Sequence, residues 1–208
     1  MFVTKFHRVC LASMLAISML LALPCHAQKK TKAEIKITKI GCEAVKTPRF
    51  KDSTENEKDY WGRFYVKFDL QSSGGKDEWL DSLDITWKIV CTDKTTNRPK
   101  LYSLTVTYED IEKGTGHNAC IFLKPKFLRR FTNSKRFVPG DFSVYVEIAV
   151  DGQRVASEID TKPAHKTLKN WQKEEADRGR SERYLIPKSK TPFASLDYDY
   201  WENERAAE

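Results

Sequence analysis

Apolar and polar residues alternate along most of the chain between residues 34 and 159, which is the period of strands that bury one face. The segment from Tyr60 to Leu70 alternates most clearly, but Trp61 and Tyr65 fall on its polar side, so we expect another element to cover them. In the first segment the parity slips between Ile37 and Ile40, which predicts a β-bulge. Seven segments of this kind are predicted strands: 34–42, 60–70, 83–91, 101–108, 119–123, 142–150 and 153–159.

Turn signals, and not helices, separate these segments. Asp151-Gly152 between the last two is a strong two-residue hairpin signal. Such spacing is typical of an antiparallel sandwich or barrel and argues against βαβ units. Trp87 beside Cys91 resembles the immunoglobulin core, although Trp87 precedes both Cys91 and Cys120, so the order of a true immunoglobulin domain is not reproduced. We therefore predict a mainly-β fold, an Ig-like antiparallel β-sandwich of about seven strands, with an OB-type or other barrel as the alternative.

The end of the chain has a different pattern. Residues 163 to about 176 read as one weakly amphipathic helix, and 184–187 and 191–194 read as extended segments. Residues 194–200 then alternate as a strand, and an acidic tip follows. A strand at the very end of a sandwich suits pairing with the edge of a partner. The candidate partner-binding residues are Phe193, Leu196, Tyr198, Tyr200 and Trp201.

The beginning of the chain has the form of a secretory signal peptide. Lys5 and Arg8 precede an apolar run that ends at Pro24, and the small-residue pattern predicts cleavage after Ala27. The run is shorter than a bilayer span requires, and a retained anchor is the alternative. We therefore expect a signal peptide at 1–27, an Ig-like domain at 28–162 and a C-terminal helix plus extended, acidic-tipped tail at 163–208. This layout predicts export to the periplasm, the cell surface or the medium of a bacterium.

Cleavage would leave three cysteines, Cys42, Cys91 and Cys120, in an oxidising compartment. We predict a Cys91–Cys120 disulfide, because one residue ends a predicted strand and the other begins one. That bridge would close a loop of about 28 residues and contribute roughly 3–4 kcal/mol. A Cys42–Cys91 bridge and three buried thiols are the alternatives.

Positive charge is concentrated in residues 124–136, with Phe127, Phe131 and Phe137 interleaved. Basic side chains beside aromatic rings suit a polyanion or glycan, whereas export makes a nucleic acid an improbable partner. The alternative is an exposed loop whose aromatic residues pack inward. The candidate anion-binding residues are Lys124, Lys126, Arg129, Arg130, Lys135 and Arg136.

Catalytic signals are weak throughout the chain. Only His117 and His165 would remain after cleavage, no G-x-S-x-G turn is present, and no C-x-x-C pair or glycine-rich phosphate loop occurs. We therefore predict no enzyme, no metal site and no cofactor. The alternative is an exported glycan-acting hydrolase that uses paired carboxylates from two acidic loops. Its candidate residues are Asp77, Glu78, Asp81, Asp84, Glu109, Asp110 and Glu112.

Three features together resemble a known family: the export signal, the Ile-rich first strand ending in Cys42, and the tail segment Tyr184-Leu185-Ile186-Pro187-Lys188-Ser189-Lys190-Thr191-Pro192-Phe193-Ala194. This combination is similar to the secreted pilus-like immunoglobulin-fold proteins of the Verrucomicrobia. The resemblance implies a non-enzymatic, extracytoplasmic Ig-like sandwich related in shape to pilus subunits, with no catalytic motif to carry over. We therefore expect an exported binding or assembly module that acts by edge-strand pairing with a protein partner or with itself.

Overall fold

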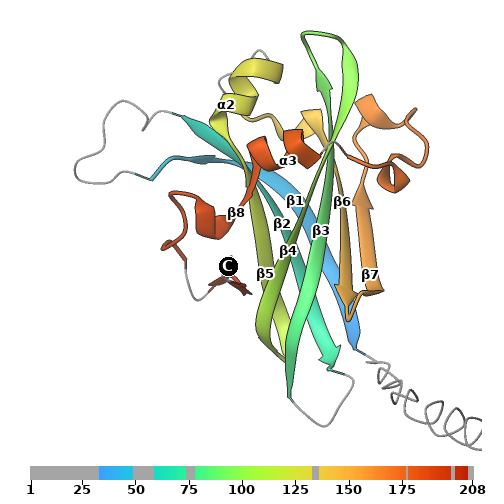
Figure 1. The fold of residues 1–208 in the computed structure, drawn as a ribbon, viewed down its shortest axis with the longest axis vertical. Coiled ribbons are helices and arrows are strands. Elements are labelled where there is room, and N and C mark those ends of the chain that lie inside the picture. Colours follow the sequence, from blue (N-terminus) through green and yellow to red (C-terminus); the bar gives the residue numbers. More distant parts are fainter. Residues whose placement is uncertain are drawn as a thin grey trace, which may run out of the picture. The chain divides into compact units, whose positions relative to one another are not determined.

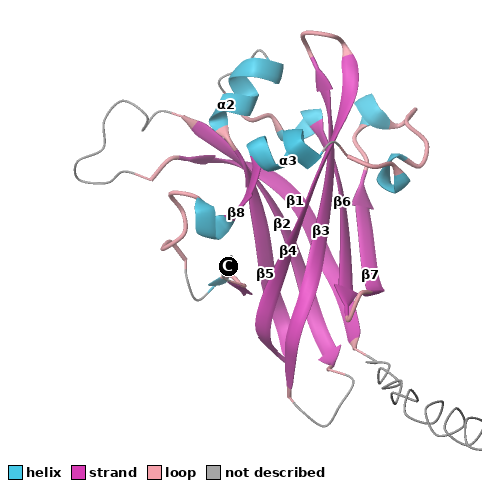
Figure 2. Cartoon of the chain, viewed as in Figure 1, coloured by secondary structure: helices cyan, strands magenta, loops and turns pink. Residues whose placement is uncertain are grey.

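The computed structural model describes residues 33–48, 59–73, 78–132, 136–176, 178–197 and 200–205, with the side chains of 178–180 left aside. The predicted signal peptide at 1–27 lies outside these residues. Two antiparallel sheets face each other (Figures 1 and 2). Sheet A has the order β1 (Glu34–Lys46), β2 (Tyr60–Ser72), β5 (Gly114–Leu123) and β8 (Leu185–Pro187). Sheet B has the order β7 (Gln153–Asp160), β6 (Phe142–Val150), β3 (Trp79–Asp93), β4 (Arg98–Glu112) and β9 (Asn203–Glu204).

The seven predicted strands are confirmed as β1 to β7, most of them longer than expected. The predicted bulge is present in β1, where the register with β2 shifts between Ile37 and Lys39. The hairpin between β6 and β7 turns on Asp151 at φ 50° and Gly152 at φ 71°. Positive φ at both central residues is the geometry that Asp-Gly supplies in a two-residue hairpin.

The strand order identifies the sandwich as Ig-like and confirms the predicted fold class. The order β1-β2-β5 matches strands A-B-E of an immunoglobulin sandwich, and β7-β6-β3-β4 matches G-F-C-C′. In the immunoglobulin fold the position beyond E belongs to strand D, which precedes E in the chain. Here β4 leads directly into β5, and β8 from the C-terminal tail occupies that position.

The core lies between the two sheets, where large aromatic side chains are fully buried. Trp87 of β3 and Tyr102 and Tyr108 of β4 are at most 1% exposed. A second group of rings fills one end of the sandwich beneath the short helix α2 (Pro125–Phe127), the π-turn η2 (Leu128–Thr132) and the 3-10 turn η3 (Pro139–Asp141). This group consists of Phe64, Phe127, Phe131, Phe137, Phe142 and Tyr184.

The single helix predicted for residues 163–176 is wrong. The segment contains two 3-10 turns, η4 (Pro163–His165) and η5 (Trp171–Lys173), and the seven-residue helix α3 (Arg178–Tyr184) follows. Asn170, at φ 56°, interrupts any continuous helix. Lys88 Nζ also donates to the carbonyls of Gln172 and Glu174, 2.7 and 2.8 Å away. Tertiary contacts with sheet B therefore override the weak helical pattern, and Trp171 anchors the segment on Val90 and Tyr145.

Cys42, Cys91 and Cys120 are free thiols, so the predicted Cys91–Cys120 disulfide is not formed. Cys91 points into the core between the sheets, whereas Cys120 lies in a separate cluster on the outer face of sheet A. Cys120 alternates along β5 with the core residues Ala119 and Ile121, so sheet A lies between the two thiols. Burial raises the pKa of Cys91 to about 12 and that of Cys42 to about 11, which keeps both thiols protonated near neutral pH.

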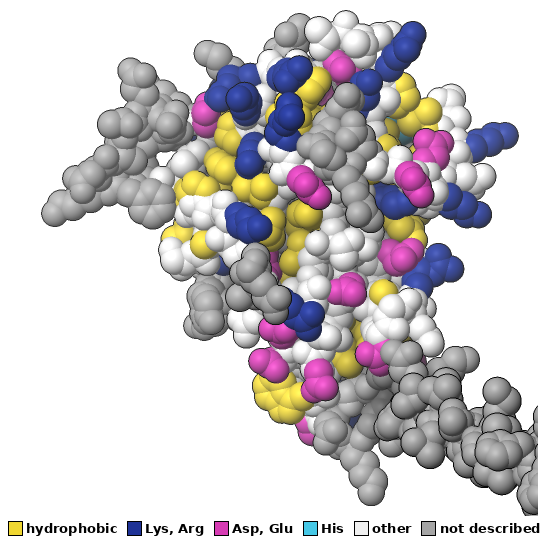
Figure 3. Space-filling model, viewed as in Figure 1, with side chains coloured by type: hydrophobic (Ala, Val, Ile, Leu, Met, Phe, Trp, Pro, Cys, Tyr) yellow, Lys and Arg dark blue, Asp and Glu magenta, His cyan; other side chains and the backbone are white. Residues whose placement is uncertain are grey.

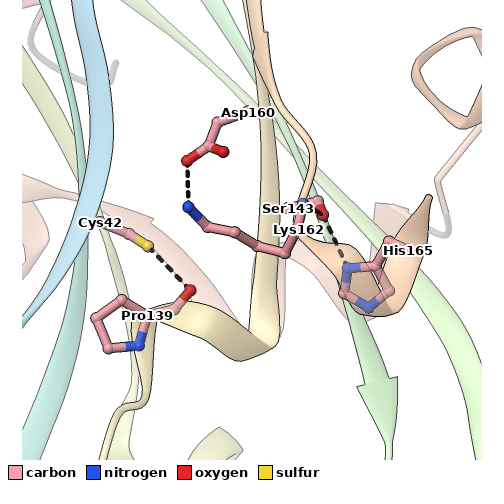
Figure 4. Close-up of polar contacts among 6 residues, drawn as sticks. All are labelled: Cys42, Pro139, Ser143, Asp160, Lys162 and His165. Carbon is pink, nitrogen blue, oxygen red and sulfur yellow. Dashed lines mark hydrogen bonds and ion pairs between the residues drawn. The ribbon is translucent and has the colours of Figure 1, made fainter.

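The start of the C-terminal segment is held to sheet B by a buried histidine (Figure 4). His165 Nδ1 lies 2.8 Å from Ser143 Oγ, and Nε2 lies 3.3 Å from Thr92 Oγ1. The same Ser143 hydroxyl accepts the backbone N–H of Lys162 at 2.8 Å, while Lys162 Nζ pairs with Asp160 at 2.5 Å. His165 is 1% exposed and Ser143 is fully buried, so the hydrogen bond between them is part of the packing of this segment on sheet B.

We expect the free energy of unfolding to fall as the pH drops below the ordinary histidine pKa of 6.5, because burial lowers the pKa of His165. Below that pH, His165 binds a proton in the unfolded chain but stays neutral in the folded chain. The stabilisation from neutral His165 is therefore complete above pH 6.5 and decreases below it, by at most about 1.4 kcal/mol per pH unit. Urea unfolding at pH 7.5, 6.5 and 5.5 measures the slope.

His117 supplies the matched control, because its hydrogen bond to Glu202 raises its pKa. Protonated His117 therefore stabilises the folded chain, and this stabilisation is complete below pH 6.5 and is lost as the pH rises through the raised pKa. His165→Asn should therefore flatten the loss of stability below pH 6.5. His117→Asn should leave that loss in place and remove the loss of stability that occurs as the pH rises above 6.5. An unchanged pH profile in His165→Asn would contradict this assignment.

Candidate interaction surface at the C-terminal tail

The tail, residues 184–205, closes the side of the sandwich where β4 and β5 end their sheets (Figure 1). β8 pairs with β5 through Leu185 opposite Leu123, Ile186 opposite Phe122, and Pro187 opposite Ile121. β9 pairs with β4 through Asn203 opposite Glu109 and Glu204 opposite Tyr108. One segment therefore extends both sheets.

Further hydrogen bonds satisfy edge groups outside these short pairings. The backbone N–H of Glu202 donates to the carbonyl of Asn118 on β5 at 2.8 Å, and that of Arg205 donates to Thr107 on β4 at 2.9 Å. The N–H of Ser103 on β4 donates to Ser181 Oγ of α3 at 2.9 Å. Exposed edge groups are templates for pairing with another chain, so the tail protects two edges at once.

Phe193 is the apolar anchor of the tail on the outer face of sheet A. Its ring stacks on Phe122 with centroids 4.7 Å apart, and it meets Trp61 edge-on at 5.8 Å. Cys120 and Ile186 complete this cluster, and Tyr65 packs against it. The expectation that another element covers Trp61 and Tyr65 is confirmed, and the covering element is the tail.

The strand predicted at residues 194–200 is wrong. Residues 192–197 form turns, in which the N–H of Ala194 donates to the carbonyl of Thr191 and that of Leu196 to Phe193. Of the candidate partner-binding residues, Phe193 is buried, Trp201 is half-buried, and Leu196 and Tyr200 are 40% and 47% exposed. Tyr198 lies outside the described residues. The residues that pair as strands are Leu185–Pro187 and Asn203–Glu204, whose runs are too short to show alternation.

The acidic tip docks within the same chain. Glu202 Oε1 lies 2.9 Å from His117 Nδ1, and Arg205 forms an ion pair with Glu109. The Glu204 carboxylate accepts the N–H groups of Lys188 and Ser189 at 2.7 and 2.9 Å, which fixes the turn after β8. These partners come from β4, β5 and the tail itself, and not from the basic segment at 124–136.

The basic segment at 124–136 presents charge without the expected aromatic platforms. Phe127, Phe131 and Phe137 are buried in the core, so the rings interleaved in the sequence are not available to a ligand. Arg129 is exposed and pairs with Asp59 at 2.5 Å, and Arg130 donates to Tyr184 Oη at 3.1 Å. Lys124 is half-buried, Lys126 and Arg136 are exposed, and Lys135 lies outside the described residues. Lys and Arg side chains gather over α2 in Figure 3.

A second group of cations lies on the outer face of sheet A, each against an aromatic ring. Lys39 Nζ is 5.7 Å from the Tyr65 ring, and the Arg63 guanidinium is 5.1 Å from Trp201. Lys67 Nζ is 5.4 Å from the Tyr200 ring and donates to its hydroxyl at 2.8 Å. Alternation places Arg63, Tyr65 and Lys67 on the same face of β2. The sequence alone did not reveal this group, because Tyr200 and Trp201 of the tail lie far from β2 along the chain.

None of the carboxylates considered for hydrolysis lines any of three surface cavities formed by described residues, one beside Lys88 and Ser103, one beside Lys188 and Glu204, and one beside Tyr145 and Arg154. Glu78 pairs with Lys113 at 3.7 Å, and Asp84 accepts the Thr107 hydroxyl at 2.6 Å. Asp77 lies outside the described residues. In the described part of the chain, no cluster of three or more His, Cys, Asp or Glu residues is arranged to hold a metal ion. No described helix has the length and hydropathy that crossing a bilayer requires.

Comparison with known proteins adds a family and a fold. A protein-family model matches residues 26–208. A crystal structure of a protein from Akkermansia muciniphila superposes with a TM-score of 0.73, covering 85% of this chain and 95% of that chain at 16% identity. At that identity the likeness concerns the fold alone. No curated protein matches the chain.

Proposed function

We propose that this chain, which belongs to the family whose model matches residues 26–208, is an exported, non-enzymatic Ig-like module that assembles by strand complementation, as pilus-like surface proteins do. The observation that carries this proposal is the strand D position of sheet A. No strand between β4 and β5 fills it, and β8 of the tail does. The chain thus contains both an acceptor edge and a donor segment.

The donor is a separable unit of structure. It pairs through only three residues in β8 and two in β9, and it adds two buried aromatic side chains, Tyr184 in the core and Phe193 on the outer face of sheet A. The same contacts would form with the tail of a second copy, so the closed monomer and an exchanged assembly differ mainly in linker geometry and effective concentration. Export, an assembly role and the lack of catalysis are parts of one proposal.

Engineered cysteines at Glu109 and Asn203, which are Cα partners between β4 and β9, test the exchange. One full-length variant carries Glu109→Cys and a second carries Asn203→Cys. After the two are mixed and oxidised, we expect a covalent heterodimer, because an exchanged tail brings Cys from one chain opposite Cys from the other. Non-reducing electrophoresis and light scattering measure the product.

Each single variant oxidised alone is the matched control, since the native thiols are half-buried or buried. The double variant in one chain should give a monomeric crosslink at low concentration. A mixture that yields no more heterodimer than the single variants yield homodimers, while the double variant crosslinks within one chain, would refute assembly by tail exchange.

A further inference from the structure

The outer face of sheet A combines cations and tyrosine rings from three separate segments. Lys39 comes from β1, Arg63, Tyr65 and Lys67 come from β2, and Tyr200 comes from the tail. Each cation lies within 6 Å of a ring centroid, as the distances above show. Such pairs hold the rings and the charges together on one surface.

Two of these lysines oppose each other directly. Lys39 and Lys67 are Cα partners across β1 and β2, next to the bulge, and both side chains point to the outer face. Like charges in this position destabilise a sheet. Among the described residues, no carboxylate forms an ion pair with either ammonium group.

The nearby acids already have other partners. Glu43 Oε1 accepts Arg63 Nη2 at 2.7 Å and Nε at 3.0 Å, and Asp69 Oδ1 accepts the N–H of Gly116 at 3.0 Å. The two ammonium groups therefore lie against the Tyr65 and Tyr200 rings, and among the described residues neither has a carboxylate as an ion-pair partner. An anion placed between the two ammonium groups would remove the repulsion.

We infer that this face binds an acidic polysaccharide, with a carboxylate or sulfate group between Lys39 and Lys67 and the adjoining sugar ring against Tyr200. Tyrosine presents an apolar ring and a polar hydroxyl, which matches the apolar face and the hydroxyl edge of a sugar. Tyr200 is 47% exposed and is held in place by Lys67. Tyr65 is more covered and packs against the cluster around Phe193, so the face offers one open ring, whereas a nucleic acid strand uses successive stacking platforms.

Titration calorimetry with the full-length chain tests this inference, with a polygalacturonate oligosaccharide and a heparin oligosaccharide as the acidic probes. Lys39→Met and Lys67→Met should each weaken binding by about tenfold, because each removes a charge-assisted contact. Lys39→Met should melt at or above the wild-type temperature, since it relieves the lysine repulsion, whereas Lys67→Met also loses the hydrogen bond to Tyr200. A lower affinity in Lys39→Met then reports a lost contact and not a lost fold.

Lys36→Met is the matched control, because Lys36 also lies on the outer face of β1 but opposite Asp69. It should bind as the wild type does, as should Arg129→Glu in the basic segment. An equal loss in Lys36→Met, or a larger loss in Arg129→Glu, would overturn the site. So would equal affinity for neutral dextran or for single-stranded DNA, or no binding of either acidic probe. Tail exchange has a separate readout, so one proposal can fail without the other.

Discussion

Replacing Phe193 with alanine is expected to release the tail from sheet A. The ring is 7% exposed, stacks on Phe122 and meets Trp61 edge-on, so its removal leaves a cavity beneath the tail. Truncation of a buried phenylalanine destabilises a protein by about 3–5 kcal/mol, and aromatic pairing is part of that effect. β8 itself makes only three residue pairs, so Phe193 contributes a large share of the contacts that hold the tail on the outer face of sheet A.

Hydrogen exchange at Ile186 and limited proteolysis of the tail measure the effect, and light scattering reports the consequence for association. We expect faster exchange in β8 and more self-association, because the edges of β4 and β5 become free. Leu196→Ala is the matched control, since Leu196 is in the same turn segment but 40% exposed, and should change stability by no more than about 0.5 kcal/mol. Equal protection of β8 in Phe193→Ala and wild type would show that Phe193 is not the anchor.

Replacing Gly62 with alanine is expected to destabilise the other end of the core. A Cβ atom at Gly62 would lie 2.3 Å from Cε2 of Phe137, far inside contact distance. The Phe137 ring has little room to move, because it stacks on Phe142 at 4.6 Å and meets Phe64 at 5.6 Å. Overpacking of this kind costs about 1–3 kcal/mol, which urea unfolding resolves.

Gly140→Ala is the control for this substitution, because a Cβ atom there meets no atom within 4 Å. It should leave stability nearly unchanged. Adding Phe137→Leu to Gly62→Ala should recover part of the loss, since a smaller side chain makes space for the new methyl group. Equal stability of Gly62→Ala and the wild type would show that the Phe137 ring can move aside, which would contradict the tight packing inferred here.

Much of the sandwich was predictable from alternation alone. The bulge in β1 followed from the slipped parity at Ile37 and Ile40, and the β6–β7 hairpin followed from Asp151-Gly152. Trp61 and Tyr65 on the polar side of β2 correctly predicted a covering element. These features are local: each depends on side-chain direction along one strand or on the backbone of one turn.

The C-terminal part of the chain was poorly predictable, because its conformation depends on distant partners. Residues 163–176 have a helical pattern, yet Lys88 and the contacts of Trp171 hold them as separate turns. The alternation at 194–200 predicts a strand, yet Phe193 docks on Phe122 and the chain turns there. In both cases packing against a sheet outweighs a weak local preference.

The candidate sites divide in the same way. The sequence by itself determined which residues were available: a basic segment at 124–136, aromatic residues in the tail, and few groups suited to catalysis. Only the tertiary structure decided which of them meet. It buries Phe127, Phe131 and Phe137, separates Cys91 from Cys120, and brings Tyr200 to Lys67 across 133 residues. A single strand reveals its own buried face, but its neighbours are set by the order of strands in the sheets and by the path of the tail.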